Sequence, residues 1–270
     1  MITITDLHKK FYPGTANEVY ALCGIDLKVN AGDFVTIIGT NGSGKSTLLN
    51  AVAGTFLPDS GKIEIAGEDT TYKKDYQRVK FVSRVFQNPF MGTAPDMTIA
   101  ENLHMAWLRG HHRHPKIGLG SERRNAYREA VAQLEMQLED RLDNLIGTLS
   151  GGQRQALTLL MAVISEPKVL LLDEHTAALD PKSAAQIIKM TKYFIERSGF
   201  TTLMVTHSMQ QALDLGSRTI MMNKGKVIDD IPLAEKNRLT VEDLLSKFAE
   251  IRKVERLTDD LLQDLQREYV

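Results

Sequence analysis

Short apolar runs recur along the chain, separated by turn residues and by longer segments with helical periodicity. Residues 19–38 contain two such runs on either side of a polar turn at 30–33, and the second run continues into a glycine-rich stretch. Further runs lie at 62–66, 79–86, 168–172 and 201–206, and a turn at 223–225 divides a hairpin. The runs at 168–172 and 201–206 do not alternate with polar residues, which is typical of strands covered on both faces. The pattern predicts an α/β fold.

Helical periodicity dominates the middle and the end of the chain. A short helix is predicted to end at Gly54, and residues 153–164 are apolar nearly all round, which predicts a buried helix. A stripe at spacings of three and four predicts one helix face formed by Tyr127, Val131, Leu134, Leu138 and Leu142. A second stripe contains Leu244, Phe248, Ile251, Val254, Leu257, Leu261 and Leu265. We expect a helical lobe inserted at about 92–165 into a domain spanning 1–232, and a C-terminal helical extension over 233–270 that packs onto that domain or binds a partner.

Composition and charge narrow the class of protein. The 270 residues are 43% hydrophobic, which is enough to bury a sizeable core. Lysine and arginine number 33 against 34 acidic residues, so the charge gives no reason to expect a nucleic acid as partner. The single cysteine excludes an internal disulfide and fits a reducing cytoplasm. No apolar run approaches the roughly 18 residues of a membrane span, so work at a membrane would need a separate membrane protein.

The glycine-rich stretch has the P-loop pattern for binding phosphate, with a strand before it and a helix after it. Glycines let the backbone curl so that its N–H groups point inward at a triphosphate. A lysine at Lys45 supplies a charge for the β- and γ-phosphates, and the Ser46 hydroxyl is suited to Mg²⁺. The expected ATP-binding residues of this loop are Gly39, Thr40, Asn41, Gly42, Ser43, Gly44, Lys45, Ser46 and Thr47.

An acidic pair follows the buried run at 168–172. Asp173 is expected at the end of a strand, at the edge where ligands bind in open α/β sheets, and there it would hold Mg²⁺ through the water shell of the metal. Glu174 is next along the chain and can polarise the attacking water as a general base. The acidic pair therefore supplies a metal ligand and a catalytic base for the nucleotide that the phosphate loop would bind.

A second candidate phosphate site is the sequence LSGGQ, which consists of Leu149, Ser150, Gly151, Gly152 and Gln153. Its Ser-Gly-Gly start could be a plain helix cap, but small residues before a helix N-terminus also bind phosphate. A second phosphate grip on one chain makes sense if it serves the nucleotide of a neighbouring copy. With these ordered motifs, residues 1–232 resemble the ATPase subunits of ABC transporters.

The resemblance implies a fold and further site residues. The fold would be a P-loop NTPase with a RecA-like core, an N-terminal antiparallel β-subdomain and an inserted α-helical subdomain. Phe11, or as a second choice Tyr12, matches the aromatic residue that stacks on adenine. Gln87 matches the glutamine that reaches the metal and the water, and His207 matches the histidine that contacts the γ-phosphate. Asp180 matches the loop that crosses the dimer interface and also fits a helix N-cap.

The resemblance also implies partners. Two chains would bind head to tail, with each ATP between Lys45 of one copy and Ser150 and Gly152 of the other. The helical lobe would dock onto a separate membrane permease, which places the chain peripherally at the cytoplasmic face of the membrane. An extracytoplasmic solute-binding protein would complete an importer. An exporter ATPase is the closest alternative. A soluble ABC ATPase of DNA repair is less favoured, because it would carry a long coiled coil between the two phosphate motifs.

Two features set this chain apart from the common family pattern. His175 stands where most members carry proline, which removes a backbone restraint but leaves Asp173 and Glu174 in place. The sequence DEHTAALD and the loop at 92–96 resemble importer ATPases that work with permeases for branched-chain or aromatic amino acids.

A histidine cluster formed by His111, His112 and His114 has no acidic partner nearby in sequence, so we expect a solvated loop rather than a metal site.

Overall fold

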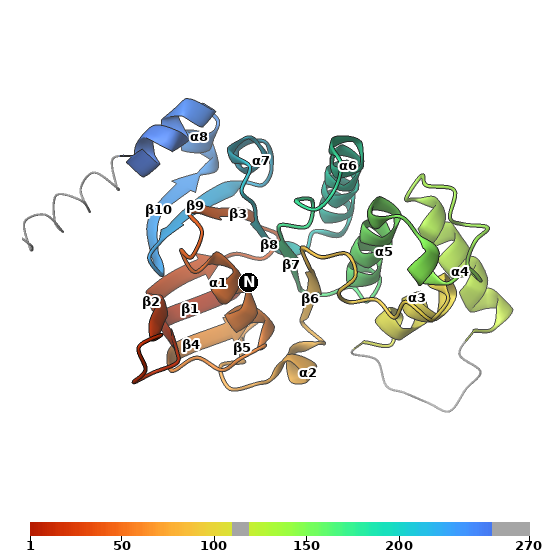
Figure 1. Cartoon of the computed structure of the whole chain (residues 1–270), viewed down its shortest axis with the longest axis horizontal. Coiled ribbons are helices and arrows are strands. Elements are labelled where there is room, and N and C mark those ends of the chain that lie inside the picture. The colour runs from red at the N-terminus through yellow and green to blue at the C-terminus, as the bar shows by residue number, and fades with distance from the viewer. Residues whose placement is uncertain (110–118, 250–270) are drawn as a thin grey trace, which may run out of the picture.

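The computed structural model describes residues 1–109 and 119–249 (Figure 1). Its central sheet contains β3 (Phe34–Gly39), β6 (Val82–Val85), β7 (Val169–Asp173), β8 (Thr201–Val205), β9 (Arg218–Asn223) and β10 (Lys226–Pro232). The strand order is β10-β9-β3-β8-β7-β6. All neighbours are parallel except β10, which forms the predicted hairpin with β9. Every residue of β7 and β8 is buried, as their unbroken apolar runs predicted.

A second, antiparallel sheet covers one side of the molecule. It contains β1 (Ile2–Phe11), β2 (Val19–Val29), β4 (Ser60–Ile65) and β5 (Glu68–Asp69), in the order β2-β1-β4-β5. Its apolar face shares one core with the central sheet and with helix α1 (Lys45–Ala53). That helix ends at Gly54, whose φ of 80° is the left-handed conformation that glycine adopts without strain. The predicted α/β fold with an antiparallel β-subdomain is confirmed.

The remaining helices lie around the two sheets (Figure 1). They are α2 (Asp75–Arg78), α3 (Ile99–Trp107), α4 (Ser121–Ala132), α5 (Gly151–Val163), α6 (Pro181–Ser198), α7 (Met209–Asp214) and α8 (Leu233–Lys236), with a 3-10 turn at Ile146–Thr148. Helix α5 is buried along nearly its whole length, and its apolar residues join those of α3, α4 and α6 in one core. In the described parts of the chain, no helix has the length and hydrophobicity needed to cross a membrane.

The apolar stripe from Tyr127 to Leu142 is not one helix, so that prediction was wrong. Helix α4 ends at Ala132, and Glu135 and Gln137 have φ values of 54° and 56°, which no α-helix accommodates. All five stripe residues are nevertheless buried in the same core. Periodicity identified the buried positions correctly, because the segment beyond the helix still packs against other helices: the Leu134 carbonyl accepts from Gln186 on α6, and the Leu142 carbonyl accepts from the Ala100 N–H on α3.

The C-terminal extension is helical over residues 241–249. Leu244 and Phe248 are buried against Ile38, Met221 and other apolar residues of the main domain, so the described part of this stripe packs onto the chain itself. The rest of the stripe, at positions 251–265, and the histidine cluster at 111–114 lie outside the described residues.

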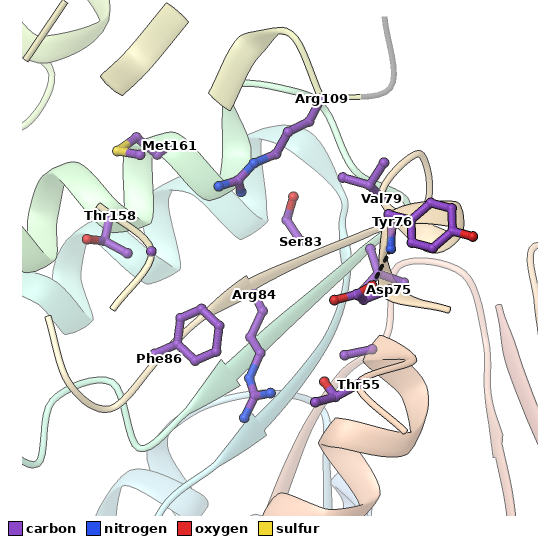
Figure 2. Close-up of a pocket in the computed structure, with 13 residues that line it drawn as sticks. Thr55, Asp75, Tyr76, Val79, Ser83, Arg84, Phe86, Arg109, Thr158 and Met161 are labelled. Carbon is purple, nitrogen blue, oxygen red and sulfur yellow. Dashed lines mark hydrogen bonds between the residues drawn. The ribbon is translucent and has the colours of Figure 1, made fainter. Parts of the chain in front are cut away.

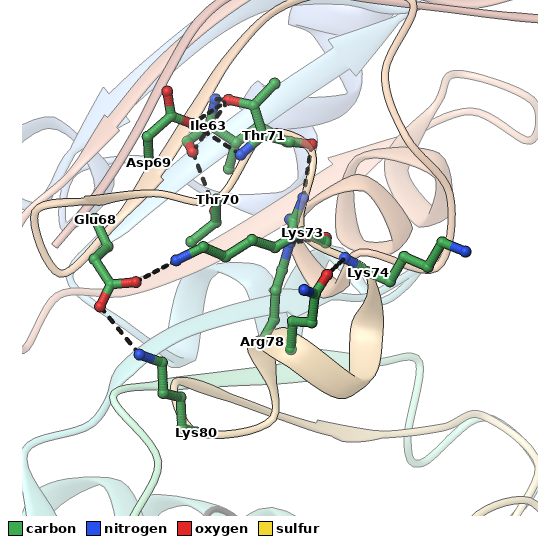
Figure 3. Close-up of polar contacts among 10 residues, drawn as sticks. Ile63, Glu68, Asp69, Thr70, Thr71, Lys73, Lys74, Arg78 and Lys80 are labelled. Carbon is green, nitrogen blue, oxygen red and sulfur yellow. Dashed lines mark hydrogen bonds and ion pairs between the residues drawn. The ribbon is translucent and has the colours of Figure 1, made fainter.

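Arg78 joins the antiparallel subdomain to helix α1 and is completely buried (Figure 3). Its guanidinium donates to the carbonyls of Ala51 at 2.6 Å and Val52 at 2.8 Å, in the last turn of the helix. It also donates to the carbonyls of Lys73 and Thr71 at 2.8 Å and 3.1 Å. Burial lowers its pKa to about 10, so the group is still charged at neutral pH. A cation at this end of a helix complements the carbonyls that lack a partner within the helix.

His175 is also buried, at 1% exposure, and its Nε2 shares a hydrogen bond of 3.0 Å with the Thr191 hydroxyl on α6. Burial lowers its pKa to about 4, because the charged form loses its hydration. His175 is therefore a neutral core residue that ties the end of β7 to α6.

Replacing Arg78 by methionine will destabilise the fold by about 3 kcal/mol, because four buried carbonyls lose their donor. The midpoint of urea unfolding measures this change. The matched control is Arg197→Met on the exposed face of α6, which is expected to stay within about 0.5 kcal/mol of the wild type. Equal effects of the two substitutions would contradict the role given to Arg78.

His175 makes stability depend on pH. Between the ordinary histidine pKa of about 6.5 and the folded value of about 4, only the unfolded chain takes up the proton. The free energy of unfolding therefore falls as the pH decreases through this window, by up to about 3 kcal/mol. In His175→Gln, which keeps a polar partner for Thr191 and does not titrate, this part of the decrease is lost. Urea unfolding at several pH values, in the presence of EDTA, measures the free energy of unfolding as a function of pH. If this free energy fell equally with pH in the wild type and in His175→Gln, the prediction would be contradicted.

Candidate nucleotide-binding site

The expected site residues follow neighbouring strands at one edge of the central sheet. The glycine-rich loop at 39–47 comes directly after β3, and His207 follows β8. Asp173 ends β7, with Glu174 after it, and Gln87 follows β6 by two residues. Because these four strands are parallel neighbours in the order β3-β8-β7-β6, their carboxyl ends meet at the same edge. The topology thus gathers residues that are far apart in sequence.

The loop after β3 requires glycine at two positions. A Cβ atom at Gly39 would lie 2.3 Å from the carbonyl oxygen of Met222. Gly44 precedes α1 with a φ of 98°, and a Cβ there would lie 2.5 Å from the carbonyl oxygen of Ala21. The Ser43 hydroxyl between them is buried, and none of the described residues hydrogen-bonds to it. The loop is held in a curled shape with a polar interior.

Lys45, the first residue of α1, turns back over this loop. Its ammonium group donates at 2.9 Å to the carbonyls of both Gly39 and Thr40, and the residue is 6% exposed. Burial lowers its pKa, although the nearby Glu174 and Asp173 carboxylates act in the opposite direction. The cation therefore lies inside the curl of the loop, where an anion would be attracted.

Asp173 links three elements through its carboxylate. The Ser46 hydroxyl on α1 donates to its Oδ1 at 3.1 Å. Its Oδ2 accepts from Arg84 of β6 at 2.6 Å, and the same guanidinium donates to the Asn50 side chain on α1 and lies 4.7 Å from the centre of the Phe86 ring. Our sequence analysis missed Arg84. The available signal was a single arginine inside the apolar run at 79–86.

Glu174 and His207 face each other across the ends of β7 and β8. Glu174 Oε1 lies 2.6 Å from His207 Nε2, and the glutamate side chain is 10% exposed against 47% for the histidine. The φ of Glu174 is 47°, a value that costs energy for any residue except glycine, while its N–H donates to the Val205 carbonyl at 3.0 Å. With this backbone conformation the Glu174 carboxylate lies against the His207 ring.

A second residue missed by sequence reasoning is Gln155, which is fully buried on α5. Its side-chain amide donates to the carbonyls of His175 at 2.7 Å and Phe86 at 3.2 Å. It therefore fixes the segment after β7 against the segment after β6. Gln87, which follows Phe86, is exposed.

The two aromatic residues expected near the base have different environments. Phe11 ends β1 and packs edge-on against Phe56, with ring centres 5.4 Å apart. The Lys9 ammonium lies 5.7 Å from the centre of the Phe11 ring. Tyr12 is 68% exposed and has a φ of 53°.

The LSGGQ segment does not join this group of residues. Ser150 and Gln153 form a reciprocal cap at the start of α5, with the Ser150 hydroxyl accepting from the Gln153 N–H at 3.3 Å. Together with Gly152 they line an opening of about 330 Å³, which shares no residue with the opening beside the glycine-rich loop. Asp180 caps the neighbouring helix α6 and also retains its predicted N-cap geometry.

The residues at the sheet edge fit ATP and Mg²⁺. An opening of about 650 Å³ lies between Gly39, Thr40 and Asn41 on one side and His207 on the other. The buried Ser43 hydroxyl and the Lys45 ammonium are donors suited to phosphate oxygens. Ser46 and Asp173 bring two oxygen atoms within 3.1 Å of each other, and oxygen donors are what Mg²⁺ prefers.

Comparison with known proteins supports this assignment. The ABC transporter family model matches residues 22–177. The chain is 43% identical over 250 residues to a tyrosine transport ATP-binding protein of Clostridioides difficile, covering 92% of this chain and 98% of that protein. It is 34% identical to an aliphatic sulfonates import ATP-binding protein of Rhizobium johnstonii, covering 86% of this chain and 77% of that protein.

A solved structure shows the same fold. It is a dimeric ATP-binding cassette in a post-hydrolysis state bound to ADP and phosphate. The TM-score is 0.74 at 29% identity, and the match covers 86% of this chain and 99% of that one. The predicted P-loop NTPase fold is confirmed. Because the family model matches more than half of the chain, this protein belongs to the ABC transporter family, as an ATP-hydrolysing cassette that binds ATP with Mg²⁺.

Proposed function

We propose that this cassette powers the import of a small organic solute, such as an amino acid, through a separate membrane permease. It would lie at the cytoplasmic face of the membrane as a peripheral subunit and work with an extracytoplasmic solute-binding protein. The similarity to a tyrosine transport ATP-binding protein supports this proposal, because it extends over 98% of that protein. A second relative, named for sulfonate import, supports the direction of transport.

In this proposal the residues at the sheet edge divide the work of hydrolysis among them. Lys45 binds the β- and γ-phosphates, and Ser46, Asp173 and Gln87 hold Mg²⁺. Glu174 orients the attacking water as general base. The observation that carries this assignment is the 2.6 Å contact between Glu174 and His207, since it places a nearly buried carboxylate against a side chain that lines the opening beside the loop.

His207 then contacts the γ-phosphate from the side opposite the glycine-rich loop. Its distance from the Glu174 carboxylate allows the histidine to fix the position of the base as well as to sense the nucleotide. The left-handed backbone of Glu174 is consistent with this, because such strain concentrates at active sites. Phe11 is assigned to the adenine, with Tyr12 as the alternative.

We further propose that two copies bind ATP between them, head to tail. Ser150, Gly151, Gly152 and Gln153 of one copy would complete the phosphate grip of the other, and Asp180 would lie at the same interface. The separate opening at the start of α5 supports this, because none of the residues that line it also lines the opening beside the loop of the same chain. The similar cassette solved as a dimer with ADP and phosphate is also consistent with it.

A groove between the β-subdomain and the helical lobe is our proposed docking site for the permease (Figure 2). It encloses about 290 Å³, and its walls come from α2, β6 and α5. Tyr76 in this groove is 69% exposed, and Phe90 and Met91 in the segment after Gln87 are 61% and 52% exposed. Phe90 and Met91 are neighbours in the chain, and large apolar side chains exposed side by side are typical of an interaction surface.

The division of the chain is part of the same proposal. We assign the cassette to residues 1–232, with the helical subdomain inserted at about 92–165, and an extension to 233–270. The burial of Leu244 and Phe248 against the main domain supports an extension that stabilises the cassette.

Transport in the source organism tests the proposed function. Replacing Glu174 by glutamine in the chromosomal gene removes the proposed base, so uptake of the transported amino acid is expected to fall at least about tenfold. Uptake of each labelled amino acid, tyrosine first, measures the effect. The matched control is Glu196→Gln, the same chemical change at an exposed position on α6. Unchanged uptake of every amino acid in a strain that makes the variant stably would contradict import of this solute class.

A further inference from the structure

Arg84 is a buried cation that the proposed mechanism does not use. It lies on β6, and its side chain is 13% exposed, while the side chain of its partner Asp173 is 11% exposed. Its Nη2 atom lies 2.6 Å from Asp173 Oδ2, and its Nη1 donates to the Asn50 side chain on the phosphate-loop helix. Strand β6 thus places a positive charge beside Asp173, the carboxylate that we assign to Mg²⁺.

The two oxygen atoms of Asp173 are divided between different groups. Oδ1 accepts from Ser46, the other residue assigned to the metal, and Oδ2 accepts from Arg84. Two positive charges would therefore interact with the same carboxylate: a metal ion beside Ser46, and the guanidinium of Arg84. Since electrostatic interactions are strong where water is scarce, the guanidinium weakens the attraction of Asp173 for a second cation.

The contacts of Arg84 are poorly explained by stability alone. Its Nε atom is buried, and none of the described residues hydrogen-bonds to it. The guanidinium approaches Asp173 through one nitrogen, although a two-pronged contact would be stronger. A buried ion pair is in general no more stabilising than apolar side chains of similar volume. A role in the chemistry of Asp173 accounts better for a charge at this position.

We propose that Arg84 is a positioning residue that acts through Asp173 and sets how strongly nucleotide binding depends on Mg²⁺. The Arg84 guanidinium neutralises part of the charge of the Asp173 carboxylate. Mg²⁺ therefore raises the nucleotide affinity less than it would if Ser46 and Asp173 acted without this arginine. The inference rests on the proposed role of Asp173 at the metal. Arg84 and Phe86 also line the groove assigned to the permease, so the same guanidinium lies between that groove and the metal site (Figure 2).

The test measures binding rather than hydrolysis. ADP affinity is determined by isothermal titration calorimetry with Mg²⁺ and with EDTA, and the ratio of the two affinities is compared between variants. Arg84→Met and Arg84→Gln remove the positive charge. Arg84→Lys keeps the charge but replaces the planar guanidinium by an ammonium group. The matched control is Arg218→Met, which breaks an ion pair with Asp230 between the strands of the β9–β10 hairpin. Thermal unfolding of each variant confirms that it is folded.

Removing the charge is expected to raise the affinity ratio on the order of tenfold in both neutral variants. Arg84→Lys and Arg218→Met are expected to stay near the wild-type ratio. A ratio that is unchanged or lower in the neutral variant that folds would overturn the inference. So would a lysine variant that behaves like the neutral ones, because the charge would then not be the cause.

Asp173→Asn separates this inference from the function on which it rests. If Asp173 acts at the metal, its loss greatly reduces the affinity ratio, and Arg84→Met added to Asp173→Asn has no further effect. If Asp173→Asn leaves the ratio unchanged, the proposed role of Asp173 is wrong. If it lowers the ratio but the Arg84 variants do not shift it, only the inference about Arg84 is wrong.

Discussion

The Ser46 hydroxyl donates to Asp173 at 3.1 Å, and this contact joins the first turn of α1 to the carboxyl end of β7. It is possible only because β3 and β7 run parallel on either side of β8. The same arrangement places His207, the second residue after β8, across an opening from the phosphate loop and in contact with Glu174. One strand order therefore brings together, from three distant parts of the sequence, the phosphate loop and the residues that we propose as metal ligand, base and nucleotide sensor. Changing the order of these strands would separate all of them.

The same sheet edge also connects the nucleotide site to the surface. Strand β6 ends beside β7, and Gln155 of α5 holds the segments after both strands through two carbonyl contacts. Arg84 reaches from the groove to the Asp173 carboxylate, and Arg78 reaches from α2, at the edge of that groove, to the end of α1. A change in the groove can therefore alter the nucleotide site through packed and hydrogen-bonded side chains. This is the physical requirement for coupling ATP hydrolysis to a membrane partner.

Local rules in the sequence predicted most of the sheet and the loop. The glycines before Lys45 are required by backbone geometry, and unbroken apolar runs identified β7 and β8 because both faces of those strands are buried. The end of α4 could not be predicted, because the helix stops in a segment without glycine or proline. Arg84 was missed for a different reason. Its partner Asp173 is 89 residues away, and no local pattern reveals that two strands so far apart will pair.

In the proposed dimer, one ATP binds between the phosphate loop of one copy and LSGGQ of the other. Light scattering of Glu174→Gln with and without Mg-ATP tests it most directly, because blocked hydrolysis preserves the nucleotide that joins the copies. We predict an ATP-dependent shift from monomer to dimer, which disappears when Ser150→Arg is added although ATP still binds. A Glu174→Gln protein that binds ATP and stays monomeric at high protein concentration would contradict the claim, as would a dimer that Ser150→Arg leaves intact.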